Sequence, residues 1–142
     1  MSIQEIEQEI IEEFSNFEDW MDKYSYIIEI GNSCPMIDEK DKVESNLIKG
    51  CQSRVWVSAK LNDKGLMEIS ADSDAVITKG IITLLLRAFN NQKPEAVYAA
   101  DVKFVDEIGL KSHLSPTRSN GLLSMIKQIK LYALAFSVKQ NQ

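Results

Sequence analysis

Residues 54–61 read Arg54-Val55-Trp56-Val57-Ser58-Ala59-Lys60-Leu61, and their character alternates along the stretch. Successive side chains of a strand point to opposite faces, so the odd-numbered apolar residues would share one face and Arg54, Ser58 and Lys60 the other. The next four residues, Asn62-Asp63-Lys64-Gly65, are typical of a turn, and residues 66–71 supply a returning strand. The stretch therefore predicts an antiparallel β-hairpin.

A third strand is expected upstream of this hairpin. Residues 43–49 could pair with the free edge of the strand at 54–61 and complete a three-stranded antiparallel sheet. In that arrangement Gly50-Cys51-Gln52-Ser53 forms the tip of the first hairpin.

Helical patterns precede the strands. Ser2 and Glu5 form a capping-box sequence, and apolar residues then recur at helical spacing as far as Phe14, with Glu7, Glu9, Glu12 and Glu13 expected to face outward. A second helix is expected after Asn16 and should end at Gly31, followed by a loop over residues 32–44.

Helical patterns also follow the strands. Asp72-Ser73-Asp74 is expected to cap a third helix that runs to Phe89, and a helical turn should follow Pro94. Ser115-Pro116 is a helix start, with proline at the first helical position of a long C-terminal helix. Helices, then hairpins, then helices predict an α+β fold in which helices pack on an antiparallel sheet.

Composition is that of a globular protein. The 142 residues fit one domain spanning 1–142, with 44% hydrophobic and 26% charged residues. The longest apolar stretch, residues 80–86, is too short to span a bilayer, so no membrane partner is expected. The acidic N-terminus does not resemble a secretory signal, which predicts a cytoplasmic protein with free thiols at Cys34 and Cys51.

Charge is divided unevenly along the chain. Residues 1–47 hold 13 acids and 3 bases, whereas residues 48–142 hold 8 acids and 13 bases. This pattern fits either an ordinary basic C-terminal helix or a basic face that docks an acidic partner protein. Nucleic acid is not an expected partner, since no dense run of bases or interleaved aromatic residues is present.

Cys51 is the residue that most suggests chemistry. It follows a glycine between two strand-like segments, so its side chain should project from a turn, where a thiol can meet the sulfur of another protein. Lys49, Arg54 and Lys60 lie nearby without an acid between them, and positive charge lowers the pKa of a thiol. These residues alone leave a functional and an incidental loop cysteine both open.

Three blocks of sequence resemble the SufE-like family of sulfur-acceptor proteins. They are Gly50-Cys51-Gln52-Ser53-Arg54-Val55-Trp56, then Asp72-Ser73-Asp74-Ala75 with Lys79-Gly80, and finally His113-Leu114-Ser115-Pro116-Thr117-Arg118-Ser119-Asn120-Gly121-Leu122. The segment Tyr26-Ile27-Ile28-Glu29-Ile30-Gly31 matches as well. The resemblance covers nearly the whole chain in the family's order.

The resemblance implies a sulfur-transfer function. In the family, a cysteine desulfurase that carries pyridoxal phosphate forms a persulfide, and the acceptor cysteine, here Cys51, takes its outer sulfur and hands it to an iron–sulfur scaffold complex. No cofactor is implied on this chain itself, and a monomer or a homodimer is compatible with the role. The implied fold is similar to that of iron–sulfur scaffold proteins, with a three-stranded antiparallel sheet. A regulatory module that binds the desulfurase without carrying sulfur and a thiol redox sensor are the alternatives.

The matched blocks nominate residues around Cys51 for partner binding or loop support: Gly50, Gln52, Ser53, Arg54, Asp74 and Arg118. Arg118 could contact a partner, support the loop, or pair with Asp72 or Asp74, while Asp74 is expected first to cap the third helix.

Three further residues are weaker candidates. A Cys/His hydrolase would need His113 within reach of Cys51 together with an orienting group, and the sequence shows no such set. Cys34 is either incidental or a resolving thiol for Cys51, and no zinc-ligand spacing is present. Trp56 is expected in packing, with partner contact as the alternative.

Overall fold

The computed structural model describes residues 1–140 and combines a two-stranded sheet with helices. In chain order the elements are α1 (Ile3–Phe14), α2 (Trp20–Ile30), β1 (Val55–Leu61), β2 (Met67–Ser73), α3 (Val76–Phe89), α4 (Pro94–Ala99), α5 (Phe104–Glu107), α6 (Leu110–His113) and α7 (Pro116–Gln140). Short 3-10 turns at Gly31–Ser33, Glu39–Asp41 and Glu44–Asn46 lie in the connection between α2 and β1.

The predicted β-hairpin is confirmed. β1 and β2 pair antiparallel, from Val55 opposite Ser73 to Leu61 opposite Met67. The turn is held by the Asn62 side chain, whose Oδ1 accepts the amides of Lys64 and Leu66. Gly65 has a φ of 76°, a left-handed conformation that glycine adopts without steric cost.

The predicted third strand is wrong. Residues 44–46 form a 3-10 turn, and the only strand-like pairing between this segment and β1 that the described residues show is a single bridge from Leu47 to Trp56. The Ile48 amide also donates to the Val55 carbonyl at 2.8 Å. The chain between these contacts is therefore a loop closed at its base, and the sheet has two strands rather than three.

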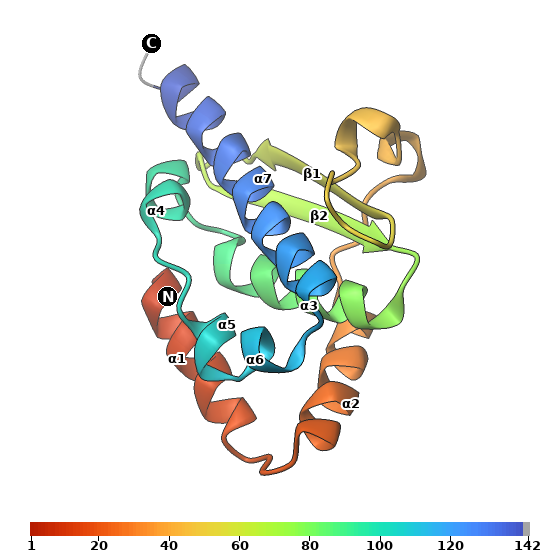
Figure 1. Ribbon diagram of the computed structural model, residues 1–142. Coiled ribbons are helices and arrows are strands. Elements are labelled where there is room, and N and C mark those ends of the chain that lie inside the picture. Colours follow the sequence, from red (N-terminus) through yellow and green to blue (C-terminus); the bar gives the residue numbers. More distant parts are fainter. Residues whose placement is uncertain (141–142) are drawn as a thin grey trace.

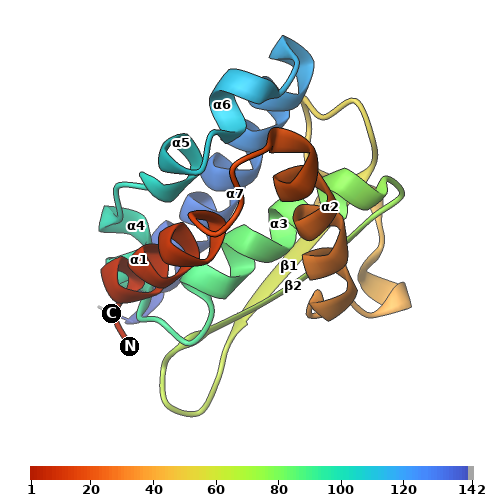
Figure 2. The ribbon, with the colours of Figure 1, turned by 90° about the horizontal axis from the view of Figure 1, so that it is seen from below.

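The helices form layers on one side of the hairpin. α3 packs on β2 and α7 on β1, while α1 and α2 pack on the far side of α3. From the bottom of Figure 1 upward, the order is α1 and α2, then α3, then the strands; Figure 2 shows α1 and α2 nearest the viewer. Buried apolar side chains from all these elements join one cluster.

Residues 116–139 of α7 are long and apolar enough to cross a membrane, judged by length and composition alone. Core helices of soluble proteins meet the same criterion.

Local signals account for the helix starts in the first part of the chain. The capping box of α1 is present, with the Ser2 hydroxyl accepting the Glu5 amide and the Glu5 carboxylate accepting the Ser2 amide. α2 begins later than expected because Asp19 is its N-cap.

Glu7 was expected to face outward, and this prediction is wrong. Its side chain is 7% exposed and accepts the amides of Lys103 and Phe104 at the start of α5.

The cap predicted for α3 is wrong. Ala75 is the N-cap and provides no side-chain hydrogen bond, while Asp72 and Asp74 are engaged elsewhere. Ser73 Oγ accepts the Ala75 amide at 3.2 Å and so provides a hydrogen bond at this end of the helix.

An ion-pair cluster joins α1, α2 and α3. The Arg87 guanidinium donates to both carboxylate oxygens of Glu13 and to Glu9, and the Tyr26 hydroxyl also donates to Glu13. The hydrogen bonds from Arg87 hold the pKa of Glu13 below its ordinary value, and the hydrogen bond to Glu13 raises the pKa of Tyr26 to about 12. The cluster therefore favours an ionised Glu13 in the folded state.

Arg87→Met is expected to lower the free energy of unfolding at neutral pH by about 1–3 kcal/mol, because Glu13 loses charge-assisted hydrogen bonds in a half-buried position. A carboxylate with a depressed folded pKa stabilises the fold above its unfolded pKa of about 4.3, and this contribution is lost as pH falls further. Urea unfolding at pH 7 and pH 3 should therefore show a smaller acid-induced loss in the variant. If acid lowered the free energy of unfolding equally in both proteins, Arg87 would not be the cause of the lowered pKa of Glu13.

Candidate functional site

Cys51 lies in the closed loop that precedes β1 and is partly buried against the first turns of α7. Its thiol donates a long hydrogen bond to the Gly121 carbonyl, with 3.6 Å between sulfur and oxygen. Beside it is a cavity of about 20 Å³. Besides Cys51, the cavity is lined by Gln52, Thr78, Ile81, Thr117, Arg118, Gly121 and Met125. One water-sized sphere needs about 10–15 Å³, so the cavity has room for about one water molecule.

The loop turns at Gly50, immediately before the cysteine. Gly50 has a φ of 92°, and a Cβ built on it would lie 2.9 Å from the Ser124 hydroxyl oxygen on α7. Only glycine adopts this conformation without strain. The N-terminal side of the loop therefore approaches α7 closely.

Several hydrogen bonds hold the C-terminal side of the loop. Asp74 Oδ1 accepts the Arg54 amide at 3.0 Å, and the Ser73 hydroxyl donates to the Arg54 carbonyl at 2.8 Å. The Ser53 hydroxyl donates to Thr78 Oγ1 at 3.1 Å, and Thr78 is 7% exposed. Asp74 thus supports the loop that carries Cys51, whereas from the sequence it was expected first to cap the third helix and second to contact a partner.

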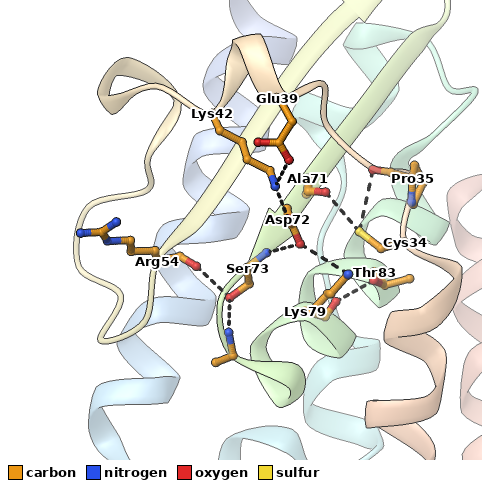
Figure 3. A network of polar contacts seen from close by, with 11 residues as sticks. Cys34, Pro35, Glu39, Lys42, Arg54, Ala71, Asp72, Ser73, Lys79 and Thr83 are labelled. Carbon is orange, nitrogen blue, oxygen red and sulfur yellow. Dashed lines mark hydrogen bonds and ion pairs between the residues drawn. The ribbon is translucent and has the colours of Figure 1, made fainter.

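Asp72 is the centre of a neighbouring polar network (Figure 3). It pairs with Lys42 at 2.6 Å and with Lys79 at 3.4 Å, and Lys42 also pairs with Glu39 at 2.8 Å. Burial alone would raise the pKa of Asp72, but its bond to Lys42, the Ser73 amide and the charge of Lys79 together bring that pKa below its ordinary value. The network fastens the segment before the Cys51 loop to β2 and α3.

Arg118 is not the partner of Asp72 or Asp74 that the sequence left open. Lys42 and Lys79 pair with Asp72, and the backbone of Arg54 occupies Asp74. The Arg118 side chain is exposed in the wall of the cavity beside Cys51, and its amide donates to Ser115 Oγ at the start of α7. The helix start predicted at Ser115-Pro116 is thereby confirmed.

Gln52 and Arg118 are exposed residues that line the cavity beside the thiol, and Arg54 is an exposed residue three positions after Cys51 in the chain. The Arg54 side chain points away from the Asp72 network (Figure 3).

The thiol is not activated in this conformation. Burial raises the pKa of Cys51 above its ordinary value. The prediction that Lys49, Arg54 and Lys60 lower this pKa is wrong for this conformation, because all three side chains are exposed and water screens their charge. At neutral pH Cys51 is therefore mainly the protonated, weakly nucleophilic thiol.

The second cysteine is a core residue. Cys34 is 7% exposed, and its thiol donates to the Ala71 carbonyl at 3.5 Å. Burial raises the pKa of Cys34 as well, with hydrogen bonding to Thr83 and the charge of Lys79 acting in the opposite direction.

Helix geometry separates the two thiols. Thr83 and Lys79, beside Cys34, project from α3 on roughly the opposite side from Thr78 and Ile81, which line the Cys51 cavity. Both thiols are free. A disulfide between them would require the loop or the core to rearrange.

His113 and Trp56, the remaining candidates from the sequence, each contact residues outside the cavity beside Cys51. His113 stacks on Trp20 with 4.4 Å between ring centroids, and no imidazole lines the cavity beside Cys51. Lys42 lies over the half-buried ring of Trp56 at 5.7 Å. Within residues 1–140, no group of three or more His, Cys, Asp and Glu side chains is placed to hold a metal ion.

Sequence reasoning missed the residues against which Cys51 rests. Thr78, Ile81, Gly121 and Met125 line the cavity, and all four are buried. Gly121 stands within the matched block at the start of the last helix, and glycine inside a helix is the one signal that could have singled it out.

Two comparisons with known proteins bear on the fold and on the family of this chain. The solution structure of a hypothetical protein from Thermus thermophilus is similar to this chain, with a TM-score of 0.77 and 19% sequence identity over 94% of this chain and 96% of that one. At this identity the likeness shows a shared fold. The family model described as SufE, Fe–S metabolism associated domain, matches residues 8–133, which include Cys51 and every residue of its cavity. The chain therefore belongs to the SufE family, whose domain is associated with Fe–S metabolism.

Proposed function

We propose that this protein is a cytoplasmic sulfur carrier that accepts sulfur from a cysteine desulfurase onto Cys51 and passes it to an iron–sulfur scaffold complex. The single observation that carries the proposal is a thiol on a closed loop, partly buried against α7, in a chain of the SufE family. Pyridoxal phosphate belongs to the desulfurase, and Cys51 supplies the chemistry on this chain.

The transfer is a thiol exchange. The Cys51 thiolate attacks the outer sulfur of the desulfurase persulfide, the bond between the two donor sulfurs breaks, and the donor cysteine leaves as a thiolate. One sulfur–sulfur bond forms as another breaks, so no external oxidant or reductant is needed. The attacking group must be the thiolate, which requires Cys51 to lose a proton first.

Access to Cys51 therefore has to change during the cycle. In the conformation described here, burial against Gly121 raises the pKa of the thiol, which disfavours attack. A desulfurase that binds the outward conformation of residues 49–54 more tightly would shift the population toward it. In water the thiol would recover its ordinary pKa and react faster. Gln52, Arg54 and Arg118 are exposed, and in this proposal they contact the partner.

Intact-mass measurement tests the proposal. After incubation with a cysteine desulfurase and free cysteine, we expect the protein to gain the mass of one sulfur atom and to lose it on treatment with a reductant. Fragmentation should place the added sulfur on the peptide containing Cys51. Sulfur on Cys34 instead, or no gain in mass with an active desulfurase, would contradict the proposal.

A further inference from the structure

Gly121 is a buried glycine in the second turn of α7, where it faces the thiol of Cys51 directly. A Cβ built on it would lie 3.2 Å from the Cys51 sulfur, 3.6 Å from the Cys51 Cα and 3.8 Å from its Cβ. The first of these contacts is tighter than ordinary van der Waals packing. Glycine is among the least favourable residues inside a helix, so helix formation gives no reason for it at this position.

We propose that Gly121 is a positioning residue: its missing side chain forms the seat of the Cys51 sulfur and sets how far the thiol withdraws from solvent. The inference rests on the proposed sulfur-carrier function for its biological meaning, although the seat itself is a property of the free protein. A methyl group at position 121 would push the sulfur outward and shift the loop toward its reactive conformation.

The loop would move more readily than its surroundings. On the other walls of the cavity, Ile81 is 3% exposed and Met125 is 2% exposed, and both belong to helices of the core. Packed interiors resist displacement, whereas a surface loop opens at lower free-energy cost. Gly50 gives the loop a flexible end, and Asp74 anchors the other end at Arg54. If the sulfur is displaced, the backbone between Gly50 and Arg54 would therefore move.

The rate of Cys51 alkylation tests the seat without any partner. Iodoacetamide is added to the free protein, and modification of each cysteine is followed by mass spectrometry of its peptide. Gly121→Ala is expected to increase the alkylation rate of Cys51 at pH 7 about fivefold or more, the size of effect that one excess methyl in a packed site produces. Asn120→Ala, a change at the exposed neighbouring position of α7, should leave the rate unchanged.

Cys34 serves as an internal control in the same experiment. Its thiol is buried, so its alkylation reports opening of the core. The proposal requires faster modification of Cys51 with unchanged, slow modification of Cys34. An unchanged rate at Cys51, or equal acceleration of both cysteines, would overturn it.

A double-mutant cycle of Gly121→Ala with Cys51→Ala keeps the proposal testable even if the methyl group at position 121 destabilises the protein. With Cys51→Ala the sulfur is gone, and the nearest remaining Cys51 atom is the Cα, at 3.6 Å. Gly121→Ala should then raise Tm through its better helix propensity, and by clearly more than it does when Cys51 is present. Equal changes in Tm in the two backgrounds would overturn the seat.

The two proposals can fail separately. Alkylation and Tm are measured on the free protein, so a chain that never accepts sulfur could still show the seat. A chain that accepts sulfur while Gly121→Ala leaves alkylation and the Tm cycle unchanged would retain the sulfur-carrier function and lose the seat.

Discussion

A Cys51→Ser variant is expected to remain folded and to gain no sulfur when it is incubated with a cysteine desulfurase and cysteine. Serine has the shape of cysteine and is slightly smaller, and the position is only partly buried, so the free energy of unfolding should change by less than about 1 kcal/mol. Serine does not ionise at neutral pH and cannot attack a persulfide as a thiolate does. The expected effect on loading is complete loss, measured by intact mass.

Cys34→Ser is the matched control, because it removes the other thiol of the chain. Cys34 lies in the core beside Ala71, and we expect this variant to load one sulfur atom as the unmodified protein does. Loss of loading in both variants would indicate that the two thiols act together. Retained loading in Cys51→Ser would contradict the assignment of the acceptor.

The same variant separates the proposed carrier from its alternatives. A regulatory module would continue to stimulate the desulfurase after Cys51→Ser, because stimulation would depend on binding alone. A redox sensor would form a sulfenic acid or a disulfide under peroxide, and the positions of the two thiols against opposite sides of α3 give no support to a direct bridge.

Gly80→Ala is expected to produce the largest loss of stability. Gly80 lies where α3 crosses α2, and a Cβ built on it would be 2.0 Å from the carbonyl oxygen of Ile27. The obstacle is backbone, so the two helices would have to move apart. We expect a loss of about 3 kcal/mol or more and a fall in Tm of about 10 °C or more, measured by thermal and urea unfolding.

Val76→Ala is the control that tests whether helix propensity alone explains the loss of stability expected for Gly80→Ala. Val76 lies on the same helix and is 65% exposed, so its truncation should change the free energy of unfolding by less than about 0.5 kcal/mol. Alanine normally stabilises a helix by about 1 kcal/mol relative to glycine. A Gly80→Ala protein as stable as the original would mean that this contact does not set the distance between α2 and α3.

The crossing at Gly80 also concerns the site. Thr78 and Ile81, on either side of Gly80, line the cavity beside Cys51. Close packing of α2 on α3 therefore supports the helix against which the thiol rests.

Features that depend on near neighbours in the chain could be predicted from the sequence. The capping box at Ser2 and the turn at Gly65 each form within a few residues, and the alternation in residues 54–61 is a property of one strand. Helical periodicity likewise located α3 and α7. The family and Cys51 could likewise be identified from the sequence, because the motifs that indicate them are short blocks of contiguous residues.

Features that depend on distant partners were missed or misassigned. Residues 43–49 could have formed a strand, but the chain makes a 3-10 turn and one bridge to Trp56. Asp74 has the residue type of a helix cap, but its carboxylate accepts the amide of Arg54, 20 residues earlier in the chain.

The environment of Cys51 is the clearest case. The sequence determined by itself that a thiol follows a tight turn before a strand, because turn and strand preferences are local. Only the tertiary structure decided that this thiol is withdrawn and protonated, since that depends on burial against Gly121, 70 residues away. Burial and the pKa that follows from it are properties of packed surroundings, which no local segment contains.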